Sequence, residues 1–154
     1  MYKFSDNISL DDLEEEIFMV RLIAGKEGTG KTKKIIEIAN GHLVDKKGNI
    51  VFIDDDKRHM YELNHEMRFL SMDEFLIKTP EEFYGFLSGI ISNDYDIETI
   101  YIDGIFKFVD LKMADVTDYF NKLKRLTDKY ELEIVMTMSC DVNELGEDVQ
   151  AMML

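Results

Sequence analysis

The sequence predicts an α/β protein built as a three-layer sandwich, with a mainly parallel sheet between two layers of helices. Two observations support this fold class. Short apolar or β-branched segments alternate along the chain with longer segments whose apolar residues recur at helical spacing, which is typical of βαβ units. The first strand-like segment also runs into a glycine-rich stretch, residues 25–32, that precedes the first helical segment. In such a sheet the crossovers are right-handed, and ligands bind beyond the carboxyl ends of the strands.

The composition is that of one globular domain. The chain has 154 residues, of which 45% are hydrophobic and 32% charged, enough apolar material for a single core. We expect residues 1–18 to be an N-terminal extension and residues 19–154 to form the folded domain. Cys140 is the only cysteine, which excludes an intramolecular disulfide and a multi-cysteine zinc site. No apolar run approaches the roughly 20 residues that span a bilayer, and no secretory signal is visible, so we expect no membrane insertion and a cytoplasmic location.

The first half of the domain contains three expected strands and one helix. Residues 18–24 (FMVRLIA) are almost continuously apolar and predict a buried strand. Residues 31–40 have apolar positions at helical spacing and predict a helix, with Gly41 as its expected end. The β-branched residues 50–54 (IVFID) predict a second strand, and residues 67–72 (MRFLSM) predict a third more weakly.

The second half continues the alternation. A Thr-Pro pair at residues 79–80 predicts a helix start, with threonine as the N-cap and proline in the first turn. Residues 99–103 (TIYID) predict a strand. Residues 115–130 carry apolar positions at helical spacing and predict a helix with Asp115 as its N-cap. Residues 133–139 (EIVMTMS) predict the last strand.

The charge is strongly acidic overall but locally basic. The net charge of −14 disfavours nucleic acid and anionic membranes as partners. Residues 20–48 run against this trend, since they carry seven basic and three acidic residues. A local positive region in an acidic protein indicates a small anionic ligand.

The glycine-rich stretch lies within this positive region and carries the strongest motif. Residues 25–32 read GKEGTGKT and satisfy the P-loop (Walker A) pattern G-x-x-x-x-G-K-[ST] in full. The backbone N–H groups of such a loop cradle phosphates at the positive end of the following helix. Lys31 would reach the β- and γ-phosphates, and the Thr32 hydroxyl would bind Mg²⁺. The expected nucleotide-binding residues are Gly25, Lys26, Glu27, Gly28, Thr29, Gly30, Lys31, Thr32 and Lys33.

The motif predicts that residues 19–154 form a P-loop nucleotide-binding domain with P-loop NTPase topology. A Walker A site also needs a second acidic residue that helps to hold the metal ion. Asp103 closes the strand TIYID, as the acid of a Walker B strand does, and we expect it to act in catalysis and to hold the metal with Thr32. The alternative is a solvated carboxylate at the end of a strand.

The residue that follows Asp103 is Gly104, so the glutamate that polarises water in many hydrolysing P-loop proteins is missing. Asp54, Asp55 or Asp56 could supply a base instead, and Asp54 joins Lys31 and Asp103 as a candidate catalytic residue. Three adjacent acids also fit a solvated loop without a catalytic role. Hydrolysis is expected to be slow if none of them serves.

Lys26 and Ser139 are two further candidates for contact with phosphate. Lys26 stands where the deviant Walker A loop of ParA/MinD-like ATPases has the lysine that reaches across a dimer, although Glu27 departs from that loop. The alternative is an exposed Lys26 paired with Glu27. Ser139, at the end of the last strand, is a candidate sensor of the γ-phosphate.

Three segments resemble a family of small single-domain bacterial P-loop proteins, often labelled ATP-binding or twitching-motility proteins. They are Gly25–Lys34, Val51–Asp54 and Phe83–Ile105. The resemblance implies nucleotide binding at residues 25–32, and the family shares the Asp-Gly pair at the Walker B strand. More broadly, the chain is similar to RecA-like and thymidine-kinase-like P-loop folds.

The leading hypothesis is an ATP-binding, Mg²⁺-dependent NTPase with slow or partner-stimulated hydrolysis that acts as a nucleotide-dependent switch. The Asp54–Arg58 loop and the Gly104–Asp115 segment are the candidate switches. We expect ATP rather than GTP as the nucleotide, because the sequence has no Asn-Lys-x-Asp motif for guanine recognition. The alternatives are a small-molecule or nucleotide kinase and a non-hydrolysing interaction module with bound nucleotide. A homodimer or another protein partner is compatible with the sequence.

Overall fold

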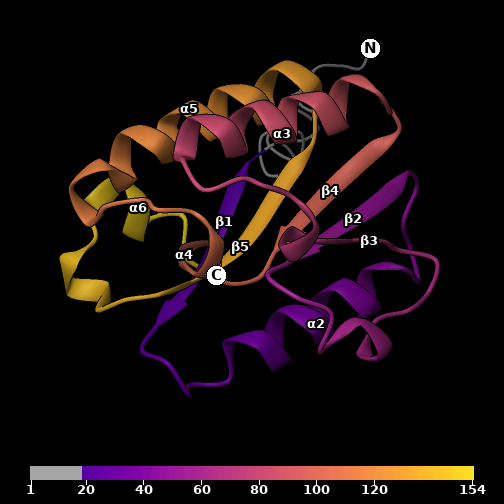
Figure 1. The fold of residues 1–154 in the computed structure, drawn as a ribbon, viewed down its shortest axis with the longest axis horizontal. Helices are drawn as coiled ribbons and strands as arrows, with labels where there is room; N and C mark the ends of the chain where they lie inside the picture. Colours follow the sequence, from indigo (N-terminus) through magenta and orange to yellow (C-terminus); the bar gives the residue numbers. More distant parts are fainter. Residues whose placement is uncertain (1–18) are drawn as a thin grey trace, which may run out of the picture.

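The computed structural model describes residues 19–154, and the expected extension 1–18 lies outside the described residues. Five parallel strands form one sheet in the order β1-β5-β4-β2-β3 (Figure 1). This confirms the α/β class and the parallel sheet. The strands are β1 (Val20–Gly25), β2 (Asn49–Asp54), β3 (Arg68–Ser71), β4 (Ile97–Ile102) and β5 (Glu133–Ser139).

Helices cover both faces of the sheet. Figure 1 shows α3 and α5 lying across one face and α2 lying on the opposite face. No helix among residues 19–154 is both long and apolar enough to cross a bilayer. The helices are α2 (Lys31–His42), α3 (Pro80–Ser92), α4 (Ile105–Phe108), α5 (Val116–Tyr130) and α6 (Glu147–Gln150), with 3-10 turns at Met60–Glu62, Met72–Glu74, Met113–Asp115 and Val142–Glu144.

The core consists of two apolar layers, one on each face of the sheet. In the smaller layer, on the face of the sheet that α2 covers, Ile35 of α2 packs in one cluster with Tyr101 of β4. On the larger side, Ile100 and Ile102 of β4 share a cluster with Phe83 of α3. Successive residues of a strand point to opposite faces, so a strand covered on both sides is apolar without interruption. This explains why the central strands were visible in the sequence as continuous apolar segments.

Helix ends agree with the sequence predictions in part. The Thr79 hydroxyl accepts from the Glu82 N–H at 3.1 Å while the Glu82 carboxylate accepts from the Thr79 N–H at 3.0 Å, a complete capping box. Asp115 occupies the predicted N-cap position of α5, although its side chain makes no capping hydrogen bond there. Gly41 was wrong as the end of α2, because the helix continues to His42 and closes through right-handed turns that need no glycine.

The strand order decides which residues meet at the carboxyl edge of the sheet. β5 lies between the strand that leads into the P-loop and β4, the strand that precedes Asp103. The pairing places Gly25 of β1 beside Ser139 of β5. On the other side of β4, the Asp103 N–H donates to the Ile53 carbonyl at 2.9 Å, so the residue that follows β4 lies next to the end of β2. The predicted site residues therefore converge on one edge.

Candidate functional site

The loop between β1 and α2 has the backbone shape of an anion cradle. Gly28 and Gly30 adopt left-handed conformations, with φ of 81° and 85°, which side chains rarely tolerate. The Thr29 hydroxyl donates to the Lys26 carbonyl at 2.8 Å and closes the turn. No side chain caps the start of α2, and its first turn contains no acid. The first N–H groups of α2 are therefore available to an anion.

A pocket of about 320 Å³ opens above this loop. The Lys31 ammonium lies over the interior of the loop, where it donates to the Lys26 carbonyl at 2.8 Å. Two strands away in the sheet, Asp103 lines the same pocket. Of the expected nucleotide-binding residues, six line the pocket: Glu27, Gly28, Gly30, Lys31, Thr32 and Lys33.

The remaining three predicted loop residues have other positions. Gly25 and Thr29 shape the turn, since a Cβ on Gly25 would lie 3.3 Å from the Thr29 hydroxyl. Lys26 is exposed and lines a neighbouring cavity with Glu27. Within residues 19–154 no ion pair joins Lys26 to Glu27, so the predicted pairing of these two residues was wrong.

Asp103 is the centre of a buried hydrogen-bond network. Its Oδ2 accepts from the Thr32 hydroxyl at 2.9 Å, and its Oδ1 accepts from the Thr137 hydroxyl at 2.6 Å. Thr137 in turn accepts from the Gly104 N–H at 2.6 Å. Asp103 is only 1% exposed, which excludes the alternative of a solvated strand-end carboxylate. The network joins the first turn of α2 to the ends of β4 and β5.

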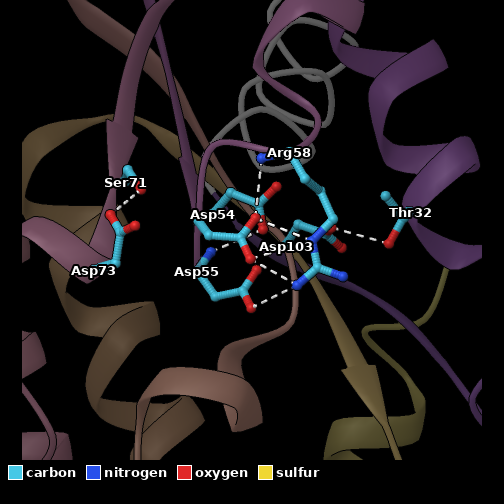
Figure 2. A network of polar contacts seen from close by, with 8 residues as sticks. Thr32, Asp54, Asp55, Arg58, Ser71, Asp73 and Asp103 are labelled. Atoms are coloured by element: carbon cyan, nitrogen blue, oxygen red, sulfur yellow. Dashed lines mark hydrogen bonds and ion pairs between the residues drawn. The ribbon is translucent and has the colours of Figure 1, made fainter.

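Asp54 is a second buried acid beside Asp103 (Figure 2). Its Oδ1 accepts from the Asp55 N–H at 2.8 Å, while its Oδ2 has no hydrogen-bond partner in the part of the chain that is described. Burial raises the pKa of Asp54 to about 8, and the Asp55 side chain and the negative charge of Asp103 push it in the same direction. Asp54 does not line the phosphate pocket and adjoins it through Asp103.

The three consecutive aspartates have different environments. The Arg58 guanidinium donates to Asp56 from Nε at 3.0 Å and from Nη2 at 2.6 Å, and its Nη2 lies 3.7 Å from Asp55. This pairing lowers the pKa of Asp56 to about 2. Asp56 is therefore a paired, ionised surface acid, whereas Asp54 is buried and holds its proton more tightly.

Two residues that line the pocket, Thr137 and Lys107, were not predicted from the sequence. Thr137 interrupts an apolar strand with a hydroxyl, and this polar residue inside β5 was the available signal. Lys107 belongs to α4 and lines the pocket together with the loop residues. A Cβ on Gly104 would lie 2.8 Å from the Lys107 Cδ, so the lysine side chain folds across that glycine.

Gly104 also explains the missing glutamate. It adopts a left-handed conformation with φ of 74°, and its N–H is bonded to Thr137. A larger residue here would be strained by the positive φ, and its Cβ would displace the Lys107 side chain. The position after Asp103 is thus occupied by a turn residue, and a base for water would have to come from elsewhere.

Fold and site together define a class of protein. A glycine-rich loop between β1 and α2, a buried acid directly after β4, one strand between β1 and β4, and an all-parallel sheet characterise the P-loop NTPase fold. Among solved structures the chain is similar to the flagellar accessory protein FlaH from Methanocaldococcus jannaschii, with a TM-score of 0.53 and 18% identity over 92% of this chain and 71% of that one. At this identity the likeness shows the fold. No protein-family model and no curated protein sequence matches the chain, so the narrower family resemblance stays a prediction.

Proposed function

We propose that this chain is an ATP-binding, Mg²⁺-dependent P-loop NTPase that hydrolyses slowly or under partner stimulation and acts as a nucleotide-dependent switch. The observation that carries the proposal is the hydrogen bond between the Thr32 hydroxyl and the Asp103 carboxylate at 2.9 Å. It brings together the two groups that a P-loop protein uses to hold the metal, although 71 positions separate them in the sequence.

The residues present suit a triphosphate with Mg²⁺. Mg²⁺ keeps most of its water and takes one or two carboxylates together with phosphate oxygens, so one hydroxyl and one carboxylate are sufficient protein ligands. When bound, it would neutralise charge on the β- and γ-phosphate oxygens. Lys31 would contribute a positive charge from the loop and Lys107 one from α4. These features support ATP and Mg²⁺ as the ligands.

Two features of this chain favour slow turnover. The position after Asp103 has a left-handed backbone that disfavours a glutamate there. Asp54 is the nearest alternative base, but a pKa of about 8 keeps it mostly protonated at neutral pH, and a protonated carboxyl does not accept a proton from water. A partner that moves the Asp54–Arg58 loop would change this environment. The combination suits a switch better than a fast enzyme.

The test is titration with a fluorescent ATP analogue, with and without Mg²⁺, while phosphate release is followed in the same samples. Lys31→Ala should weaken binding at least about 30-fold, because a charge-assisted contact to phosphate is lost. Lys34→Ala is the matched control, since this lysine lies exposed in the same helix. Its binding should stay within about twofold of the parent.

The outcomes separate the competing functions. Binding that is lost only in Lys31→Ala, together with slow release, supports the switch. Binding without any release would contradict the hydrolase and favour a kinase or a nucleotide-bound interaction module. Failure of the parent to bind the analogue would overturn the proposal.

A further inference from the structure

A second, larger cavity adjoins the phosphate pocket. It is an open groove of about 1020 Å³ at the carboxyl edge of the sheet, and it shares Lys107 and Ser139 with the phosphate pocket. Its walls come from the residues after β2, the segment between β3 and α3, and the segment after β4. Two of these walls are the candidate switch segments, Asp54–Arg58 and Gly104–Asp115.

Backbone hydrogen bonds and an aromatic contact hold the walls of the groove together. The Asp73 N–H donates to the Asp55 carbonyl at 3.0 Å and joins the first two walls. The Asp110 N–H donates to the Lys78 carbonyl at 2.7 Å and joins the second wall to the third. The ring of Phe108 meets that of Phe83 edge-on at 5.4 Å and anchors the third wall to α3. The groove is therefore a formed surface of the fold.

Its lining is apolar with an acidic rim. A large aromatic residue, Phe75, lines the groove at 37% exposure, and its ring packs edge-on against that of Phe86 at 4.8 Å, which holds it in the groove wall. The rim carries five carboxylates against two lysines, a formal charge of −3, and Arg58 offsets part of this at Asp55 and Asp56. The apolar side chains that line the groove include Phe75, Ile77, Phe106, Phe108, Leu111 and Met113.

The charge of the rim selects the occupant. Residues 1–18 of this chain carry one lysine and six acids, and a second copy has a net charge of −14, so both are repelled. Nucleic acid is repelled for the same reason. The volume lies at the upper limit of small-molecule pockets and suits several side chains of a peptide. An apolar groove with acidic edges matches an amphipathic helix whose polar face is basic.

We propose that this groove docks a basic amphipathic helix of a partner protein, with its apolar face against Phe75, Phe106 and Phe108 and its lysines or arginines on the acidic rim. Lys107 links the docking surface to the nucleotide, since it lines both cavities. A triphosphate that attracts Lys107 would shift the short helix α4, and with it Phe106 and Phe108. This coupling rests on the proposed function, whereas docking in the groove does not.

The probe is a fluorescein-labelled peptide of about 18 residues, composed of Leu and Lys, with leucines at the i, i+3, i+4 and i+7 spacing of one helix face. Binding to the full chain is measured by fluorescence anisotropy. One control peptide has the same composition without an apolar face, and a second has Glu in place of Lys. Both should bind at least about tenfold more weakly than the probe.

Variants locate the binding surface. Asp110→Lys/Glu144→Lys changes the rim and should weaken probe binding about tenfold or more, because two attractive charges become repulsive. Glu37→Lys/Asp128→Lys makes the same change in net charge at exposed positions outside the groove and should alter binding less than about twofold. Phe75→Ala should weaken binding about fivefold, and Val44→Ala, an exposed apolar control, should not.

The results also separate this proposal from the proposed function. A non-hydrolysable ATP analogue with Mg²⁺ should change the affinity for the probe about fivefold or more, and Lys107→Ala should abolish that change. If no nucleotide binds but the rim variants discriminate, the groove stands and the NTPase proposal fails. The docking proposal is overturned if nucleotide binds but each groove variant changes probe affinity no more than its matched control variant does. It is also overturned if the control peptides bind as tightly as the probe. If sedimentation velocity detects a dimer of the parent that is absent in Asp110→Lys/Glu144→Lys, the groove binds a second copy of this chain, and the docking proposal is overturned as well.

Discussion

Asp54→Asn is expected to make the protein more stable at neutral pH and to remove part of its pH dependence. The Asp54 carboxyl is fully buried, its Oδ2 has no partner among the described residues, and Asp103 lies beside it. Asparagine has nearly the same shape without the charge. Its NH2 group would replace Oδ2, the oxygen without a partner among the described residues, and would place a neutral donor beside the Asp103 carboxylate.

The magnitude follows from proton linkage. The pKa of Asp54 is raised to about 8 in the folded chain from 3.8 in the unfolded chain, so between these values the folded chain holds a proton that the unfolded chain has lost. The free energy of unfolding therefore falls as pH rises through this window, by up to about 1.4 kcal/mol per pH unit. From pH 5 to pH 7 the parent would lose at most about 2.7 kcal/mol through this group. The Asn variant has no such proton to lose.

The assay is urea unfolding of both proteins at pH 5, 6, 7 and 8, in EDTA and without nucleotide. The two should be close in stability at pH 5, and the advantage of Asp54→Asn should grow toward pH 8. Asp56→Asn is the control, because the pKa of Asp56 is already lowered to about 2 by Arg58 and its ionisation does not change in this range. An advantage of Asp54→Asn that is constant or shrinks with rising pH would refute the reasoning.

Three other substitutions test the site and the fold. Thr137→Val removes the hydroxyl that bridges Asp103 and the following N–H, and it should cost about 1–3 kcal/mol in urea unfolding and weaken the Mg²⁺ dependence of nucleotide binding. Gly104→Ala should lower the unfolding free energy by about 1–2 kcal/mol because the residue has φ of 74°, whereas Gly85→Ala, in the open middle of α3, should raise it by about 0.5–1 kcal/mol. Thr79→Ala should cost about 1 kcal/mol in a thermal unfolding experiment through loss of the capping box, and an unchanged midpoint would contradict that role.

The local part of the fold was predictable because its causes are short in range. Every expected strand was found within a few residues of its predicted bounds, since alternation and β-branching act between neighbours in the chain. The Thr79 cap was also predictable, because the groups that it joins are three residues apart. Gly41 shows the limit of this approach, since the residue type suited a helix end but the backbone of α2 continues past it. Asp115 was found at its predicted N-cap position, but its side chain makes no capping hydrogen bond.

The candidate site divides in the same manner. The P-loop could be located from the sequence by itself, because its glycines, lysine and threonine act through one short turn and the helix that follows it. The hydrogen bonds to Asp103 span 71 and 34 positions, and they form only because β5 inserts between β1 and β4. Spacing along the chain does not encode which strands become neighbours.

The three aspartates after β2 show most clearly what tertiary structure decides. In the sequence, Asp54, Asp55 and Asp56 are equivalent acids at the end of a strand. In the fold, Asp54 is buried against Asp103 with a raised pKa, and Asp56 is paired with Arg58 with a lowered one. The sequence determined the class of fold and the position of the P-loop motif, because both follow from local geometry. Only the tertiary structure decided the protonation of these acids and the groove beside them, because burial and electrostatic neighbours depend on segments far apart in the chain.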